Sequence, residues 1–378
     1  MKVPALGYTT IMLREKSPEI ETDSFVNARQ DYHRHLPYSD IVLENDYIKA
    51  TFDSTTAELY SLIDKKSGKE RLRSGDTAGL RLVTAEKNNE SSWIIGRWLK
   101  SEKVTDLRSF NNFDGNLLSG ITTEHNLDGS IIKTEITLGK YDKFLKVFLE
   151  IDWKDESKGK VEQPVLYYSL PLLDSNGRVL ADVPGGAVWR EAQEIDMPSQ
   201  RYAAAEFSDG KALALVSDCK HGFRLAKGNL YCALINVAEH PDPYPERGIH
   251  EINLYIMPVT PVASEIRRET DICLNPLQNV ANTLHEGTMP ATGCFIKAES
   301  NSAVLSSIQE RNGRMSIRFF ETDGKNSQVT LRLNKNVAFA DLCDVFGKKL
   351  GDEVFVSEDT LKFSMKPYTE VELRITKQ

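Results

Sequence analysis

The sequence lacks the features of membrane, secreted and nucleic-acid-binding proteins. It has no apolar run near the length of a membrane-spanning helix, and its first residues lack the charged-then-apolar order of a secretory signal. Acidic residues outnumber basic ones by 55 to 47, and the resulting net charge of −8 repels polyanions. We therefore expect neither a membrane nor a nucleic acid as a partner, and a neutral ligand fits this charge better.

Cysteine is scarce, and its spacing argues against metal and redox sites. The five cysteines are widely separated and include no Cys-x-x-Cys pair. Cys219 and Cys232 lie in strand-like segments, where a small buried thiol is usual. We expect all five to be reduced core residues, which together with the missing secretory signal indicates the cytoplasm.

Metal-binding histidine motifs are also missing. The seven histidines include no His-Glu-x-x-His pattern, and His33-x-His35 in a polar segment is the nearest approach to a metal pair. We therefore expect no metal and no cofactor within this chain.

The recurring pattern in the sequence has a period of two. From Phe144 to Trp153 apolar residues alternate with others, as in a strand with one buried face. Turn pairs such as Asp128-Gly129 separate segments of this kind, as in antiparallel hairpins. The best helical candidate is ASEIRRETDICLNPL, which Pro276 ends. The pattern predicts an all-β chain with few helices.

Two segments without sustained periodicity divide the chain. Arg14–Asp40 is highly charged, and Asn275–Thr292 is interrupted by proline and glycine. With 378 residues, two or three cores are expected. We predict an end strand of a preceding small domain plus a linker over residues 1–40. A large antiparallel β-supersandwich would follow over 41–276, and a small β-sandwich over 277–378.

Several phrases follow one another along the chain in a fixed order. They are VPALGY at Val3–Tyr8, LENDYIKATFD followed by TAELYSLIDKKSGKE, DVPGGAVWREAQEIDMPSQRYAAAEF, YCALINVAEHPDPYPERGIHEINLYIMP, and finally SIQERNGRMSIRFFETDG with MKPYTEVELRI. Together they resemble the carboxy-terminal, β-rich half of family-38 glycoside hydrolases, the α-mannosidases. The resemblance implies that the large domain is of the galactose-mutarotase-like type.

The resemblance also implies where the chemistry resides. In that family a zinc-binding (β/α) barrel precedes the phrase that VPALGY resembles, and this chain begins two residues before that phrase. Retaining glycoside hydrolysis needs two carboxyl groups roughly 5 to 5.5 Å apart, and the family's barrel supplies them. We therefore expect no catalytic residue here, zinc only in the barrel, and no activity of this chain alone. The implied partners are a mannoside and a catalytic barrel in cis or in trans, and an apolar docking face would also allow a homo-oligomer.

A loop within Tyr231–Pro258 is the first candidate for sugar contact, because three prolines restrict its shape and ionisable residues crowd it. The planar guanidinium of Arg247 can bridge vicinal hydroxyls, and the resemblance implies an arginine here that reaches the catalytic pocket. Asp242 and His250 are its candidate neighbours. Alternatively, Arg247 pairs with Asp242 or Glu246, Asp242 caps a turn, and His250 is satisfied by backbone groups.

A second candidate group follows the bend allowed by Gly185-Gly186. Trp189 offers an aromatic face there and Arg190 a guanidinium, although both could equally pack or pair structurally. Trp93 and Trp98 would point to opposite faces of a shared strand, and either one could face a ligand.

Two alternative functions come from other classes of protein. One is a free-standing carbohydrate-binding module, because a supersandwich offers a broad concave sheet. The other is a mutarotase-like epimerase, which needs a histidine and a carboxylate converging on a sugar ring for acid and base steps. His125, His221 or His250 would supply that histidine, but the sequence pairs none of them with an obvious carboxylate motif.

Overall fold

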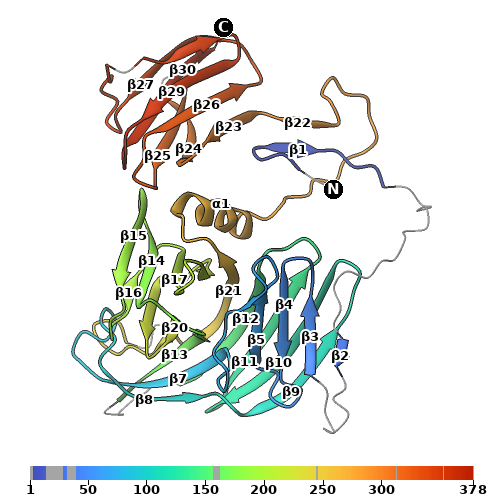
Figure 1. The fold of residues 1–378 in the computed structure, drawn as a ribbon, viewed down its shortest axis with the longest axis vertical. Helices are drawn as coiled ribbons and strands as arrows, with labels where there is room; N and C mark the ends of the chain where they lie inside the picture. Colours follow the sequence, from blue (N-terminus) through green and yellow to red (C-terminus); the bar gives the residue numbers. More distant parts are fainter. Residues whose placement is uncertain are drawn as a thin grey trace. The chain divides into compact units, whose positions relative to one another are not determined.

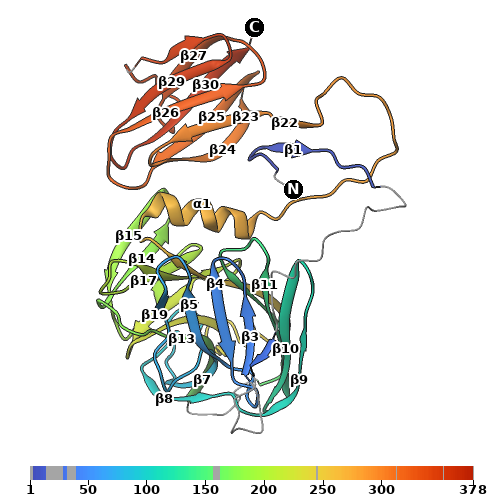
Figure 2. The same ribbon diagram turned by 45° about the vertical axis from the view of Figure 1, so that its right-hand side comes forward.

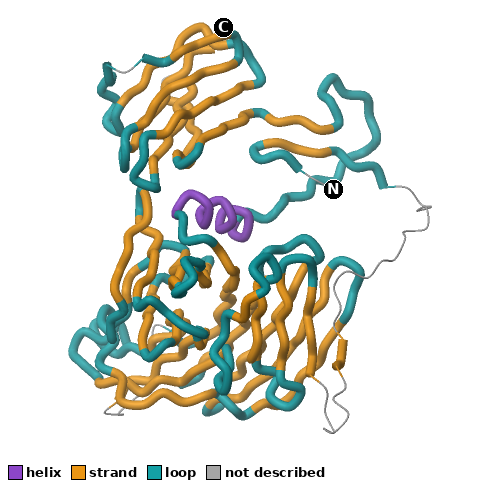
Figure 3. The backbone as a smooth tube through the Cα atoms, viewed as in Figure 1, coloured by secondary structure: helices purple, strands orange, loops and turns teal. Residues whose placement is uncertain are grey.

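The computed structural model forms two compact units and is almost entirely β-structure. It describes residues 3–13, 29–31, 40–155, 162–243, 246–311, 313–351 and 353–377. One unit comprises Glu21–Asp182 and Val188–Pro261, and the other comprises Met1–Ile20, Val183–Ala187 and Val262–Gln378. Within the described ranges α1 (Ala263–Leu274) is the single helix, as Figure 3 shows. None of the described helical structure is long and apolar enough to span a membrane. The predicted all-β fold class is confirmed.

The larger unit is a supersandwich of antiparallel sheets, as predicted (Figure 1). In spatial order its nine-stranded sheet contains β15 (Gly186–Glu191), β14 (Arg178–Val183), β17 (Tyr202–Glu206), β18 (Ala212–Ser217), β21 (Gly248–Val259), β12 (Leu145–Trp153), β11 (Ser130–Gly139), β10 (Leu118–Leu127) and β9 (Leu107–Phe113). Its six-stranded sheet contains β16 (Met197–Pro198), β19 (Gly222–Ala226), β20 (Asn229–Asn236), β13 (Glu162–Pro171), β7 (Gly79–Glu86) and β8 (Trp98–Lys103). A five-stranded sheet contains β2 (Arg29–Asp31), β3 (Asp40–Glu44), β4 (Ile48–Phe52), β5 (Leu59–Asp64) and β6 (Lys69–Glu70).

The core of this unit follows the alternation expected from the sequence. Along β12, Leu145 and every second residue up to Trp153 are buried, while the residues between them are partly exposed. These side chains join one continuous apolar core to which all three sheets contribute. The predicted turn at Asp128-Gly129 connects β10 to β11, and both residues have positive φ, 50° and 85°, which matches the twist of a tight hairpin.

A buried arginine ties two turns of the larger unit together. The Arg71 side chain is 2% exposed, and its guanidinium binds Asp64 at 3.2 Å and Asp209 at 3.0 Å. Lys69 also binds Asp209, at 3.0 Å. Burial by itself raises the pKa of Asp209, but hydrogen bonds from the Lys211 N–H, Lys69 and Arg71 outweigh it and lower the pKa to about 2. The ionised carboxylate therefore stabilises the folded state.

We expect this contribution to disappear in acid. Because the pKa of Asp209 is lower in the folded state, the stabilisation is complete above about pH 4 and is lost as the pH falls towards 2. At neutral pH, Asp209→Asn should lower the free energy of unfolding by about 1–2 kcal/mol, and this deficit should shrink steadily below pH 4. Urea unfolding from pH 7 to pH 3 measures it, with the exposed Asp46→Asn as the control. A deficit that grows in acid would show that the assigned pairing is incorrect.

The other unit contains a small β-sandwich, as predicted (Figure 2). One sheet contains β23 (Ile296–Ser300), β26 (Ser327–Leu333), β29 (Thr360–Met365) and β28 (Phe355–Ser357). The other contains β24 (Ala303–Arg311), β25 (Arg314–Glu321), β30 (Glu370–Lys377) and β27 (Val337–Cys343). Phe319 and Phe363 meet edge to face in the core between them. The same unit contains a two-stranded sheet of β1 (Gly7–Thr9) and β22 (Thr292–Cys294).

Helix α1 belongs to the unit of the small sandwich. Its N-cap residue Val262 makes no side-chain cap, but Asp323 accepts the backbone N–H of Ser264 at 2.9 Å and its hydroxyl at 2.7 Å. Arg268 donates to the carbonyl of Ser300 at 3.0 Å. The helix ends before Pro276, as expected, but the compact unit begins at Val262 rather than after the predicted boundary at residue 276. Residues 14–28 and 32–39 of the predicted linker, with His33 and His35, lie outside the described residues.

All five cysteines are free, as expected, but not all belong to a core. Cys232 is buried in β20, whereas Cys219 is exposed and Cys294 is half-buried. The expectation for Cys219 was wrong because β18 ends at Ser217, so Cys219 lies in the following turn, where its N–H faces the Ser217 hydroxyl at 3.4 Å.

Candidate functional site

The predicted sugar-contact loop connects β20 to β21 and is anchored by a buried serine. Ser91 is fully buried, and its hydroxyl accepts the backbone N–H groups of Glu239 and His240, each at 3.0 Å. Its carbonyl accepts the side-chain amides of Gln163 at 3.3 Å and Asn236 at 3.0 Å. Ser91 thus links the start of the loop both to the six-stranded sheet and to its own turn.

Ser92 extends this anchor by one residue. Its N–H donates to the His240 carbonyl at 2.8 Å, and its hydroxyl contacts the N–H and the carbonyl of Asp242 at 3.2 and 3.3 Å. Asp242 is exposed and is held through its backbone, which leaves its carboxylate at the surface. Neither serine was identified from the sequence, because about 150 residues separate each from its partners and no local motif marks such a pairing.

The turn that holds the loop also presents an aromatic ring to solvent. Trp93 is 73% exposed, and Ile94 beside it is 52% exposed. Trp98 begins β8 and packs edge to face against Tyr167 and Tyr231, with ring centroids 4.8 and 4.9 Å apart. The structure therefore makes Trp98 the packed tryptophan and leaves Trp93 available for a partner, a choice that the sequence did not make.

The far end of the loop carries Arg247 and His250. Arg247 is exposed, directly before the start of β21. His250 lies in β21, where its Nε2 is 2.7 Å from the Glu246 carbonyl and its Nδ1 is 3.7 Å from the Glu246 carboxylate. His250 thus makes a backbone contact, as expected if its role is structural rather than in sugar binding. Tyr244 and Pro245 lie outside the described residues.

The second candidate group lies on the edge strand β15. Trp189 is 41% exposed, and the guanidinium of Arg178 lies over its ring, 4.3 Å from the centroid. Arg178 also forms a two-point pair with Glu206, at 2.5 and 3.0 Å, which lowers the pKa of Glu206. Arg190, the next residue of β15, is half-buried. One face of the Trp189 ring is therefore occupied by a side chain of the protein itself.

The structure does not bring the two candidate groups together. Three strands separate β15 from β21 in the nine-stranded sheet. Through the strand registers, Val179 of β14 is level with Ala205, Leu213 and then Pro258 of β21. The sugar-contact loop instead precedes Gly248, ten residues earlier on β21 or about 33 Å along an extended strand. The two groups are separate surfaces.

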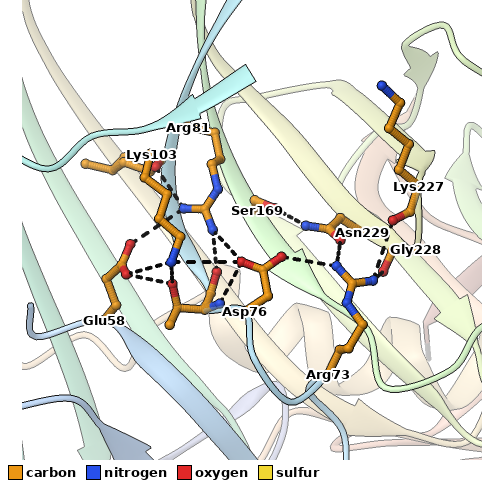
Figure 4. Close-up of polar contacts among 11 residues, drawn as sticks. Glu58, Arg73, Asp76, Arg81, Lys103, Ser169, Lys227, Gly228 and Asn229 are labelled. Atoms are coloured by element: carbon orange, nitrogen blue, oxygen red, sulfur yellow. Dashed lines mark hydrogen bonds and ion pairs between the residues drawn. The ribbon is translucent and has the colours of Figure 1, made fainter. Parts of the chain in front are cut away.

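A polar network that was not predicted from the sequence lies against the six-stranded sheet (Figure 4). Arg81 of β7 is 6% exposed at its side chain and contacts Asp76 at 3.1 Å, Glu58 at 3.6 Å and the Thr77 carbonyl at 2.7 Å. Lys103 binds Glu58 at 3.1 Å and the Thr77 hydroxyl at 2.6 Å. Opposite charges thus alternate through the network, and its donors face acceptors.

Arg73 continues this network towards β20. It donates to Asp76 at 3.1 Å, to the Asn229 side chain at 2.7 Å and to the Gly228 carbonyl at 3.2 Å (Figure 4). Asn229 in turn donates to Ser169 at 3.0 Å. Since these donors and acceptors satisfy one another, we interpret the network as a structural link between turns and sheet rather than a ligand site.

The histidines considered for epimerase chemistry differ in their contacts. His125 is buried, which lowers its pKa, and its Nδ1 has no hydrogen-bond partner among the described residues. His221 faces the Gln200 carbonyl at 2.9 Å, and His250 contacts both the carbonyl and the carboxylate of the nearby Glu246, as described above. In the described part of the chain, no group of three or more His, Cys, Asp or Glu side chains is arranged to hold a metal ion.

Comparisons with known proteins identify the family. The model of the glycosyl hydrolases family 38 C-terminal domain matches residues 43–244. An α-mannosidase from Enterococcus faecalis V583 is similar in structure, with a TM-score of 0.71 and 14% identity over 89% of this chain and 42% of that one. A family-38 glycosyl hydrolase structure from Enterococcus faecalis gives the same TM-score, identity and coverage of this chain, and 44% of that chain is covered. No curated protein matched the sequence.

The two kinds of comparison differ in what they show. At 14% identity, the structural matches establish a shared fold, and this chain spans less than half the length of either matched chain. The family model, in contrast, covers more than half of this chain. The resemblance read from the sequence phrases is confirmed, and the chain belongs to the family of glycosyl hydrolase family 38 C-terminal domains.

Proposed function

We propose that this chain is the β-rich carboxy-terminal part of an α-mannosidase and completes a mannoside-binding site with a catalytic barrel, in cis or in trans. The observation that carries the proposal is the family match over residues 43–244. The fold shared with the Enterococcus faecalis α-mannosidase supports it, because 89% of this chain corresponds to 42% of that enzyme. Nucleophile, acid and zinc would then be supplied by the barrel.

The proposed contribution of this chain is to position groups around the sugar. The Ser91 and Ser92 bonds restrict the loop that carries Asp242, and Arg247 follows at its far end. A restricted loop loses little conformational entropy when it meets a sugar, so its groups can contribute to transition-state binding. We propose that Arg247 bridges sugar hydroxyls and that Trp93 offers its ring to the sugar or to the barrel.

The first test is turnover by the purified chain. With zinc added, the chain alone should release no 4-nitrophenol from 4-nitrophenyl α-mannoside, whereas the chain joined to or mixed with a family-38 barrel should release it. The reason is that the proposal assigns both reacting carboxyl groups to the barrel. Turnover by the chain alone that disappears on mutating one of its own carboxylates would overturn the proposal.

A second test addresses Arg247 in the enzyme assembled with its barrel. Arg247→Ala should lower kcat/KM for the aryl mannoside by roughly 10- to 100-fold, the loss expected for one charged hydrogen-bonding contact. Arg108→Ala is the matched control, because Arg108 is an exposed arginine of β9 that pairs locally with Asp106. An Arg247→Ala variant as active as this control would remove Arg247 from the site but leave the barrel proposal standing.

We also propose the cytoplasm as the location of the protein. All five cysteines are free, and Cys232 is buried where an oxidant has no access. Fractionation of the native cells, with thiol labelling of Cys219 as a measure of its reduced state, tests this proposal.

A further inference from the structure

The small β-sandwich contains a cavity that none of the arguments above uses. Its volume is about 570 Å³, and it lies beside the β29–β30 turn at one end of the sandwich. Leu342, Met365 and Val371 of the sandwich core line it, together with Leu350 from the loop that follows β27. The volume falls within the range of small-molecule sites, and the apolar lining is typical of them.

The remaining lining residues carry hydrogen-bonding groups of both kinds. Asn326 comes from the β25–β26 turn, Lys366 and Thr369 from the β29–β30 turn, and Glu370 from the start of β30. The lining residues therefore carry amide, ammonium, hydroxyl and carboxylate groups beside the apolar ones. Asp344 adds a second carboxylate and the lining contains no arginine, so an anionic ligand would be disfavoured.

An exposed aromatic residue in an uncommon conformation lies between two residues that line this cavity, Lys366 and Thr369. Tyr368 is 71% exposed and has a φ of 53°, a left-handed conformation that a bulky residue rarely adopts. Glu321 holds it there by accepting its backbone N–H at 2.9 Å. The Tyr368 hydroxyl lies so close to Gly324 that a Cβ on that glycine would be 2.4 Å away. The ring therefore reaches from the β29–β30 turn, next to Thr369, to the turn that supplies Asn326.

A second exposed ring lies on a loop that begins and ends with lining residues. Phe346 is 92% exposed, and its loop runs from Asp344 to Leu350, both of which line the cavity. The Asp344 carboxylate orders this loop by accepting the N–H groups of Phe346 at 3.0 Å and Lys348 at 2.8 Å. Exposed rings held on ordered turns beside lining residues offer apolar faces to a ligand.

We infer that this cavity is a binding site for a neutral pyranoside of mono- or disaccharide size. A sugar ring has an apolar C–H face for the apolar lining and the aromatic rings, and hydroxyls that both donate and accept for the polar groups of the lining. Its lack of charge agrees with the mixed charges of the lining. The site belongs to the small sandwich and needs no barrel, so its test is independent of the proposed function.

Methyl-labelled NMR of the whole chain provides the test, because the apolar lining consists of methyl-bearing side chains. Methyl α-mannopyranoside and methyl β-glucopyranoside are the probes, with hexanoate as an apolar comparison. A pyranoside should shift the Met365, Leu342 and Val371 signals with a Kd on the order of 1 mM, while Leu254 in the other core stays unchanged. No shift at about 100 mM of either sugar, or shifts with hexanoate alone, would overturn the inference.

Two variants and a matched control assign the binding to this site. Tyr368→Ala should weaken pyranoside binding about fivefold. Tyr368→Gly should weaken it similarly without loss of stability, because glycine favours the positive φ. Phe355→Ala is the control, since Phe355 is a 61% exposed ring of the same sandwich on β28, a strand that supplies no lining residue. Equal binding by Tyr368→Gly and the parent chain would refute the assigned site.

Discussion

Replacing Arg224 by alanine should lower the free energy of unfolding of the larger unit by about 3–5 kcal/mol, the cost of leaving a buried charge without its partner. The Arg224 side chain is 2% exposed and binds Asp196 at 3.1 and 3.3 Å. Its guanidinium also lies 4.1 Å from the ring centre of Trp98. Asp196 accepts the Tyr167 hydroxyl at 2.8 Å, and burial raises the pKa of this carboxyl. Without Arg224, Asp196 would keep one partner in a poorly solvated place.

Tryptophan fluorescence during urea unfolding measures this loss. All four tryptophans lie in the larger unit, so the signal reports that unit. Arg97→Ala is the matched control, because the Arg97–Glu86 pair is exposed and its removal should leave the midpoint unchanged within error. The double variant Arg224→Ala with Asp196→Asn should regain part of the lost stability, since the unpaired charge is gone. A loss below about 1 kcal/mol for Arg224→Ala would contradict this account of the pair.

Glu321→Ala should lower the stability of the small sandwich by about 2–4 kcal/mol, because several backbone donors lose one shared acceptor. Glu321 is fully buried and accepts the N–H groups of Asp323 and Gly324, each at 3.0 Å, and of Tyr368 at 2.9 Å. Burial by itself raises the pKa of Glu321, but the nearby donors of Ser302, Tyr368 and Asp323 outweigh it and the pKa is lowered. One carboxylate thus joins the β25–β26 and β29–β30 turns.

Two spectroscopic signals separate this effect from a general loss of stability. The unit of the small sandwich contains no tryptophan, so Glu321→Ala should shift the midpoint seen by far-ultraviolet circular dichroism more than the one seen by tryptophan fluorescence. Glu310→Ala, at an exposed position of β24, is the control. The midpoint shift of Glu321→Gln should lie between those of Glu321→Ala and the control, because its amide oxygen retains one acceptor. Equal shifts in both signals would show that the two units unfold as one.

Local sequence patterns predicted the elements whose structure depends on near neighbours. The alternation in β12, the helix ending before Pro276 and the hairpin at Asp128-Gly129 are each determined within about ten residues, and each was predicted correctly. The order of the phrases along the chain also predicted the family, which the family model confirms. The prediction for Cys219 was wrong because β18 ends two residues before it. A difference of two residues in a strand end is enough to place a side chain in a turn rather than in the core.

The candidate site was less predictable because distant residues shape it. Nothing near Ser91 in the sequence indicates that its hydroxyl anchors a loop about 150 residues away. Similarly, Trp189 reads as a free aromatic face until Arg178 is found over its ring. Sugar contact by Arg247, Asp242, His250, Trp189 and Arg190 stays a prediction. The structure places these residues on two separate surfaces, and the sequence alone does not give the distance between them.

Helix α1 is capped by a residue far downstream in the sequence, and this limits where the two units can be joined in hybrid proteins. Asp323 supplies the N-terminal acceptor that Val262 does not provide, so the first turn of the helix depends on a turn some 60 residues downstream. A hybrid protein joined at residue 276 would therefore separate the helix from its acceptor. Recombination directly after Pro261 would keep helix and acceptor together, so this junction should preserve α1 in chimeric chains.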